Sequence, residues 1–255
     1  MPFLMPTRTE SFVLCKQQID ARPAIDFLAR LNETRPQDRQ ATLFHLVLRA
    51  LARVFDERPR LNRFVAGGRL YQRRGIWISM SAKQSMAENA PIFTCKRRFE
   101  PSETLEQMID GIYDILAGGR AGRESATDKE IKLLLKLPPW LLGWLTRMAR
   151  RLNHWNLVPA SMIANDPMFA SVFVANLGSV GIDACYHHNY EYGTIPIFVV
   201  MGRLHRAPVV VGEDKIEVRE VFELKYTYDE RIEDGFYCAR GLERLKYLLE
   251  HPSEL

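Results

Sequence analysis

Residues 226–235 read YTYDERIEDG and lead directly into residues 236–250, FYCARGLERLKYLLE. The spacing of apolar residues predicts a strand over residues 215–228 and an amphipathic helix over residues 236–250. The inward positions of that helix are Ala239, Leu242, Leu245, Leu248 and Leu249. The charged run that contains Asp229, Glu230 and Asp234 therefore joins a strand to a helix.

Three other sequence stretches, in a defined order, precede this charged run. Residues 174–181 read VANLGSVG, residues 197–211 read IFVVMGRLHRAPVVV, and residues 59–62 read PRLN after an apolar helix. Together with residues 226–235 they resemble the catalytic domain of the 2-oxo acid dehydrogenase acyltransferases (E2), whose signatures are Y-D-H-R-x-x-D-G, T-I-S-N-L-G-x-x-G, A-I-L-G-V-G-R-x-x-x-x-P-V-V and P-x-L-N. The related chloramphenicol acetyltransferases carry H-H-x-x-x-D-G at the same place. The resemblance covers roughly residues 10–120 and 168–252, and several ordered matches argue against chance.

The resemblance implies an α/β fold of the chloramphenicol acetyltransferase type, with a mixed sheet and flanking helices. It also implies a homotrimer with active sites at the subunit boundaries. Coenzyme A, or an arm that bears a thioester, would enter each site from one side and the acyl partner from the other. Self-association, an acyl thioester and coenzyme A or acyl-CoA as co-substrate are thus the expected partners.

The resemblance also assigns roles to single residues. Glu230 occupies the position of the family's histidine base, and Ala175 occupies that of the serine or threonine that supports the oxyanion. Asp234, which holds the geometry of the site in the family, is retained with Gly235. Asn176 and Gly178 complete the expected substrate-binding turn with Ala175. With reference pKa values of about 6.5 for histidine and 4.3 for glutamate, the exchanged base weakens proton abstraction by about 3 kcal/mol.

Two adjacent histidines follow the N-L-G turn. His187 and His188 lie in the run DACYHHNYEY, and Glu191 or Tyr190 could orient one of the imidazoles. They are candidates to replace the lost acid–base capacity. The alternative is a polar loop at a subunit contact.

The remaining sequence alternates between strand and helix patterns. Strands are expected over residues 11–20, 63–73, 76–83, 92–99, 171–175 and 195–202, and helices over 22–35, 42–58, 105–117, 128–137 and 140–155. Arg74-Gly75 indicates a hairpin between the second and third strands, and Ala66 to Arg69 a hairpin or a bulge. Gly118-Gly119 is expected to end a helix. We expect one domain over residues 1–255, with a divergent helical insertion at about residues 123–160.

Residues 140–155 form the most unusual of these predicted helices. Trp140, Leu141, Trp144, Leu145, Met148, Leu152 and Trp155 fall at helical spacing, while Arg147, Arg150 and Arg151 lie on another side. The pattern suits a helix that lies on a membrane surface or a lid over a lipophilic acyl pocket. The alternative is an ordinary helix that packs on the domain and exposes a basic face.

Composition narrows the function class. The 255 residues include 35 Lys and Arg against 31 Asp and Glu, and this mild excess does not predict a nucleic-acid partner. The 4 cysteines lie far apart, so neither a metal site nor a disulfide framework is expected, and we expect reduced thiols in the cytoplasm. No Gly-rich phosphate loop is present, which disfavours a nucleotide cofactor. No window approaches the length of a spanning helix, so the protein is expected to be soluble.

Two functions fit these patterns. The first is an acyltransferase that works through a modified site, with Glu230 as base or proton relay, Asp234 as support and His187 or His188 as substitute. The second is a catalytically inert trimeric scaffold or ligand-binding relative of the same fold, because both chemical positions are exchanged.

Overall fold

The structure, a computed structural model, describes residues 4–85, 87–120 and 136–255. One mixed seven-stranded sheet has the strand order β1-β9-β7-β6-β4-β5, and β8 pairs with the first part of β9. The neighbours β4, β6 and β7 are parallel, whereas the other pairs are antiparallel. The strands of this sheet are β1 (Phe12–Asp20), β4 (Ile76–Lys83), β5 (Ile92–Phe99), β6 (Val172–Asn176), β7 (Ile197–Met201), β8 (His205–Val210) and β9 (Ile216–Asp229).

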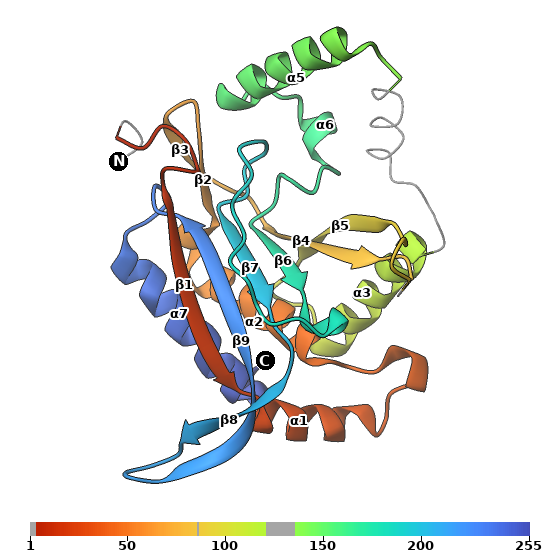
Figure 1. Cartoon of the computed structure of the whole chain (residues 1–255), viewed down its shortest axis with the longest axis vertical. Helices are drawn as coiled ribbons and strands as arrows, with labels where there is room; N and C mark the ends of the chain where they lie inside the picture. Colours follow the sequence, from red (N-terminus) through yellow and green to blue (C-terminus); the bar gives the residue numbers. More distant parts are fainter. Residues whose placement is uncertain (1–3, 86, 121–135) are drawn as a thin grey trace.

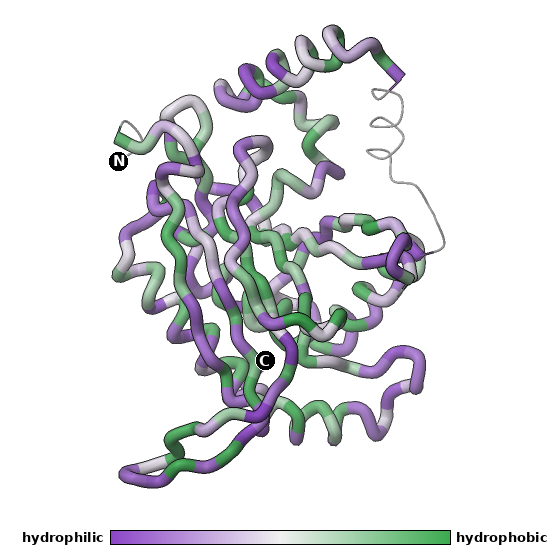
Figure 2. The backbone as a smooth tube through the Cα atoms, in the orientation of Figure 1, coloured by the Kyte–Doolittle hydropathy of each residue, from purple (hydrophilic) through white to green (hydrophobic). Residues whose placement is uncertain are grey.

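Four long helices cover one face of the sheet (Figure 1). They are α1 (Arg22–Asn32), α2 (Leu43–Glu57), α3 (Leu105–Arg120) and α7 (Gly235–Glu250). The main core lies between these helices and the sheet, and its fully buried side chains include Leu46, Phe222 and Leu248. Figure 2 shows hydrophobic residues along the central strands β6 and β7, as expected for strands that are buried on both faces.

The opposite face of the sheet carries a smaller apolar cluster, which includes Phe173, Phe198 and Val200. The loop over residues 182–193 lies on this side, where it contacts Phe198. Two further helices, α5 (Pro139–His154) and α6 (Ala160–Ile163), precede β6 in the chain. In Figure 1, α5 lies beyond the end of the sheet rather than over either face.

The predicted hairpin at Arg74-Gly75 was wrong. The hairpin or bulge expected at Ala66 to Arg69 is confirmed as a hairpin, which joins β2 (Arg63–Ala66) to β3 (Arg69–Gln72), so the strand expected over residues 63–73 is two short ones. Gly67 and Gly68 make the two-residue turn, with φ values of 56° and 71°. A turn with two positive φ angles matches the twist of paired strands, and glycine adopts it without a steric penalty.

The predicted helix end at Gly118-Gly119 was also wrong, because α3 continues to Arg120. A Cβ atom on Gly119 would lie 2.1 Å from the ring of Phe93. The glycine therefore permits close packing of α3 on β5 and does not terminate the helix.

Strand β8 was not predicted. Pro208 lies within it, and proline is tolerated there because β8 pairs only with β9 and forms an edge. The helix expected over residues 128–137 lies outside the described residues, apart from positions 136 and 137. The insertion at about residues 123–160 as a part of one domain stays a prediction.

Candidate functional site

Glu230 follows directly on the last residue of β9. Its backbone N–H donates a hydrogen bond of 2.8 Å to the carbonyl of Ser11, which precedes β1. Its side chain is half-buried, and its carboxylate has no hydrogen bond or ion pair within the part of the chain that the structure describes. The fold thus fixes the backbone of Glu230 and leaves its carboxylate available.

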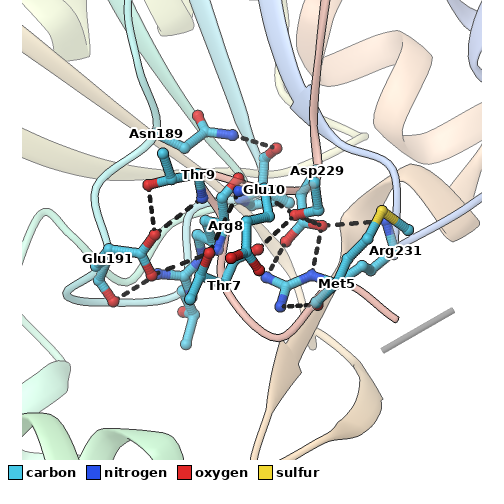
Figure 3. A network of polar contacts seen from close by, with 12 residues as sticks. Met5, Thr7, Arg8, Thr9, Glu10, Asn189, Glu191, Asp229 and Arg231 are labelled. Carbon is cyan, nitrogen blue, oxygen red and sulfur yellow. Dashed lines mark hydrogen bonds and ion pairs between the residues drawn. The ribbon is translucent and has the colours of Figure 1, made fainter. Parts of the chain in front are cut away.

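The residues on either side of Glu230 form a buried ion pair. Asp229 and Arg231 have side chains that are 1% and 4% exposed, and the Nε and Nη2 atoms of Arg231 donate to the two carboxylate oxygens at 2.8 and 2.7 Å. Arg231 also donates to the carbonyls of Met5 and Pro6, and the Ser11 hydroxyl donates to Asp229 (Figure 3). The pair therefore clamps the turn to the N-terminal segment.

A second cluster ties that segment to the loop over residues 182–193. The buried guanidinium of Arg8 donates to the carbonyls of Tyr190 and Glu191, and the Glu191 carboxylate accepts from the N–H and the hydroxyl of Thr9 (Figure 3). Burial lowers the pKa of Arg8 to about 10, and the neighbouring Asp229 carboxylate opposes that shift. Burial would raise the pKa of Glu191, but hydrogen bonds from Thr9 and Arg8 hold it below its usual value. Arg8 and Glu191 are 183 residues apart, and no local sequence pattern indicates this contact.

Asp234 caps helix α7. Its Oδ1 accepts the N–H of Tyr237 at 2.9 Å, and this hydrogen bond is the largest influence that lowers the pKa of the carboxyl group. Asp234 is exposed, and no contact within the described residues joins it to Glu230. Its role within one chain is to begin the helix that follows the turn.

The predicted substrate-binding turn lies at the end of β6. The Asn176 side chain accepts the N–H of Ser179, so it stabilises the turn itself. A Cβ atom on Gly178 would lie 2.6 Å from the Gly202 carbonyl, so glycine is required here for close packing on the chain after β7. Ala175 is half-buried and provides no hydroxyl.

The sheet register separates this turn from Glu230 within one chain. Ala175 pairs with Val200, and Val200 pairs with Lys225 on the adjacent strand. Glu230 lies five residues beyond Lys225, which corresponds to about 17 Å along an extended strand. One chain therefore does not bring the two predicted chemical positions together.

His187 and His188 lie on the face of the sheet that carries no long helix. The ring of His187 stacks on Phe198 with centroids 4.1 Å apart, and its Nδ1 lies 2.8 Å from the His188 carbonyl. His188 is exposed. No hydrogen bond or ion pair among the described residues connects either imidazole to Glu230.

Asn189 anchors the double-histidine loop near the Glu230 turn. Its Nδ2 donates to the carbonyl of Pro196 at 3.3 Å, and the same carbonyl accepts the N–H of Asp229 at 2.8 Å. The loop is thus held one strand away from the turn, which places the histidines in its neighbourhood without direct contact.

Tyr228 and Cys238 form a buried polar pair on the helix-covered face, beside an apolar cavity of about 40 Å³ between α2, α7, β7 and β9. Burial raises the pKa of each group to about 12. Both groups are therefore protonated at neutral pH, and neither is a base or a nucleophile there. The cavity is large enough for about one water molecule and does not form a substrate site.

Two arginines beside the strands are engaged in contacts within the chain. Arg73 is half-buried and donates to the carbonyl and the hydroxyl of Thr194, and Arg97 pairs with Glu103. Among the described residues, no group of three or more His, Cys, Asp or Glu side chains could hold a metal ion. No helix in the described ranges is long and apolar enough to cross a membrane.

Comparison with known proteins supports the motif assignment. Residues 164–255 match the family model of the 2-oxoacid dehydrogenases acyltransferase (catalytic domain). The lipoamide acyltransferase component of the branched-chain alpha-keto acid dehydrogenase complex of Bacillus subtilis (strain 168) is 24% identical over 214 residues. These residues are 84% of this chain but only 40% of that protein, so the chain spans less than half of its curated relative.

Solved structures with the same fold cover nearly the whole chain. A probable dihydrolipoamide acetyltransferase from Listeria monocytogenes superposes with a TM-score of 0.68, at 16% identity, over 94% of this chain and 84% of that one. The Azotobacter vinelandii dihydrolipoamide acetyltransferase gives 0.67, at 16% identity, over 94% and 81%. A chloramphenicol acetyltransferase gives 0.52, at 12% identity, over 97% and 92%. The predicted fold class and resemblance are confirmed.

Proposed function

We propose that this chain, an acyltransferase-like domain of the E2 type by its family match and its fold, transfers an acyl group from a coenzyme A or carrier thioester to a thiol or hydroxyl acceptor. The acceptor oxygen or sulfur would form the new bond to the acyl carbon, and the thioester C–S bond would break. Glu230 would take the acceptor proton and pass it to the departing thiolate, which would leave as a thiol. Atoms and charge balance without a metal or a redox cofactor.

The observation that carries this proposal is the clamp around Glu230. The buried Asp229–Arg231 pair fixes the backbone on both sides, while the Glu230 carboxylate makes no hydrogen bond or ion pair in the described part of the chain. A base must be held in position and remain free to accept a proton, and this arrangement meets both requirements.

The replacement of the family's histidine by Glu230, and of its serine or threonine by Ala175, predicts a slow enzyme. A glutamate in place of histidine weakens the base by about 3 kcal/mol on reference pKa values. The missing hydroxyl at Ala175 removes an oxyanion donor that is typically worth about 2.7 to 4 kcal/mol. His187 or His188 could compensate for part of this loss, because Asn189 bonds to the Pro196 carbonyl, which also accepts the N–H of Asp229.

A complete site would require more than one copy of the chain. Ala175 and Glu230 are separated by about 17 Å along one sheet. A homotrimer, in which the β6 end of one subunit meets the Glu230 turn of the next, would bring them together. The sheet face without long helices, with its Phe173–Phe198 cluster, is a surface that a neighbour could cover.

Coenzyme A as co-substrate and a cytoplasmic location belong to this proposal. Coenzyme A follows from the resemblance to the acyltransferase family. The four cysteines, all within the described residues, are free, which is compatible with a reducing compartment.

An inert trimeric scaffold is the second candidate. Two observations favour it: Ala175 supplies no hydroxyl, and the Asp234 carboxylate is already used as the cap of α7. In that case the protein would bind ligands or partners without catalysing a reaction.

The test combines calorimetry with coenzyme A and acetyl-CoA and an acetyl-transfer assay to dihydrolipoamide. We expect acetyl-CoA to bind and acetyl transfer to be slow. Glu230→Gln should abolish the transfer, whereas Glu213→Gln, at an exposed carboxylate in the turn between β8 and β9, should leave the rate unchanged. Glu230→His combined with Ala175→Ser should raise the rate by a factor of about 10² or more. The single changes are needed as well, because groups that act together are not additive.

Absence of coenzyme A binding, together with a silent double variant, would reject acyl transfer in favour of the scaffold. A fast wild type that loses its activity in Glu230→Gln, but keeps it in His187→Ala and His188→Ala, would make Glu230 the working base on its own.

A further inference from the structure

Helix α5 is packed in the reverse of the usual sense. A helix on a globular domain buries its apolar stripe and exposes its polar side, as α2 and α7 do. In the 16 residues of α5 the buried residue is Asn153, whose Nδ2 donates to the carbonyl of Gly193 at 3.2 Å. The ordinary packed helix that the sequence left open is therefore not what the structure shows.

The apolar residues of α5 are exposed in one row. Trp140 is 73% exposed, Trp144 52%, Met148 39% and Leu152 37%. Residues four apart lie on the same side of a helix, so these side chains form a continuous stripe. The stripe continues beyond the helix in exposed side chains of Trp155, Leu157 and Met162.

The positive charge of the protein is concentrated in the same segment. Residues 131–165 contain five Lys and Arg and no Asp or Glu, which leaves 30 Lys and Arg against 31 Asp and Glu in the rest of the chain. Arg147, Arg150 and Arg151 are exposed, and none forms an ion pair with any described residue. Along the sequence, the whole excess of positive charge thus lies in the segment that also holds the exposed tryptophans.

We propose that α5 binds flat on an anionic phospholipid surface. Its tryptophans and leucines would enter the boundary between headgroups and acyl chains, and its arginines would contact the anionic headgroups. The positive charge of α5 favours an anionic membrane over a second copy of the helix. A second α5 packed against the stripe would bring two clusters of arginines together, which is unfavourable. The domain holds α5 through Asn153, on a side other than the stripe, so no rearrangement is needed. This inference does not rest on the acyltransferase proposal.

Intrinsic fluorescence can follow the binding directly. Three of the four tryptophans, Trp140, Trp144 and Trp155, lie in or next to α5, and the fourth is Trp77. We expect the emission of the full chain to shift to the blue with vesicles of phosphatidylcholine and phosphatidylglycerol, and the protein to cosediment with them. Pure phosphatidylcholine vesicles should give neither effect, and added salt should reverse both.

Matched variants separate the two components. Trp140→Ser with Trp144→Ser, and Arg147→Gln with Arg150→Gln and Arg151→Gln, should each weaken partitioning by about tenfold or more. Phe236→Ser removes an aromatic ring that is 72% exposed elsewhere, and Arg98→Gln with Arg240→Gln and Lys246→Gln removes the same charge elsewhere. Both controls should bind vesicles like the wild type.

Three results would overturn the proposal. The first is equal binding to neutral and anionic vesicles, and the second is equal loss in the control variants. The third is a fall in melting temperature or in molecular mass of the tryptophan variant without lipid, which would show that the stripe packs within the protein or against another copy of the chain. Unchanged melting temperature and mass, with loss of vesicle binding, would support it.

Discussion

The Asp229–Arg231 pair is the residue-scale feature on which the candidate site depends. Both side chains are almost fully buried, and all the polar atoms of the carboxylate are used by Arg231, Ser11 and the turn backbone. Removing one member of a buried pair leaves the other charge without water or a partner, which is far costlier than removing an exposed pair.

We therefore expect Arg231→Met to lower the free energy of unfolding by about 3 to 5 kcal/mol. Urea denaturation followed by circular dichroism measures this. Arg203→Met is the control: it breaks an exposed pair with Asp183, in which the side chains are 53% and 65% exposed, and should change stability by less than about 1 kcal/mol. Equal losses in the two variants would show that the buried pair contributes no more than a surface one.

The sequence located this turn through its motif but not the contacts that hold it. The order of residues placed Glu230 between a strand and a helix, as observed. The Asp234 cap could have been predicted, because Asp directly before a helix is a common capping residue. The partners Arg8 and Glu191 lie in loops without a periodic pattern, so only the folded chain reveals that they meet.

At the scale of single elements, α2 shows how a capping contact introduces pH dependence. Thr42 begins the helix, as its sequence predicted, and its N–H donates to Nδ1 of His45 at 3.1 Å. Nδ1 must be unprotonated to accept this hydrogen bond. Burial, with a smaller contribution from Arg35, lowers the pKa of His45 to about 4.

We expect His45 to destabilise the fold in mild acid. The folded pKa is near 4 and the unfolded value near 6.5, so the unfolded chain binds more protons between these values. Stability is therefore complete above about pH 6.5 and falls by up to about 3 kcal/mol as the pH approaches 4. His45→Gln keeps an acceptor for the cap and does not titrate, so it should lose this part of the pH dependence.

Urea unfolding at pH 7.5 and at pH 4.5 measures the effect in both proteins. The variant corrects for the carboxylates, which titrate equally in the two chains. If the wild type and His45→Gln lose the same free energy between the two pH values, the histidine is not the acid-sensitive group of α2.

The errors in the predicted elements have one physical origin. Glycine was interpreted as a helix stop at Gly119, where its role is close packing on Phe93, and a second hairpin was expected at Gly75 in addition to the one that forms at Gly67-Gly68. Strand β8 was not predicted, although an edge strand tolerates Pro208. Such choices depend on neighbours far along the chain, which local patterns do not contain.

At the scale of the whole molecule, the candidate site raises a question of assembly. The sequence predicts that residues 175 and 230 act together, whereas the register of β6, β7 and β9 separates them. Two copies of the chain reconcile these statements if the β6 end of one subunit lies against the Glu230 turn of another. The exposed Val210, Ile216 and Val218 on the β8–β9 ribbon are further apolar surface that a neighbour could cover.

We expect a homotrimer with shared sites, with a mass by light scattering of three times the 29.5 kDa chain, about 88 kDa. Glu230→Gln and Ala175→Leu should each abolish transfer by damaging opposite halves of every site. When the two variants are coexpressed and mix at random, about a quarter of the interfaces pair an intact Glu230 with an intact Ala175, so about a quarter of the wild-type activity should return. Should Ala175→Leu fail to assemble, Asn176→Ala can replace it, because it alters the same turn. Two results would contradict shared sites: a stable monomer, or mixed trimers that mass spectrometry verifies but that stay inactive. Any active site would then lie within a single chain. Because the strand register separates Glu230 from the β6 turn, Glu230 would have to act without that turn.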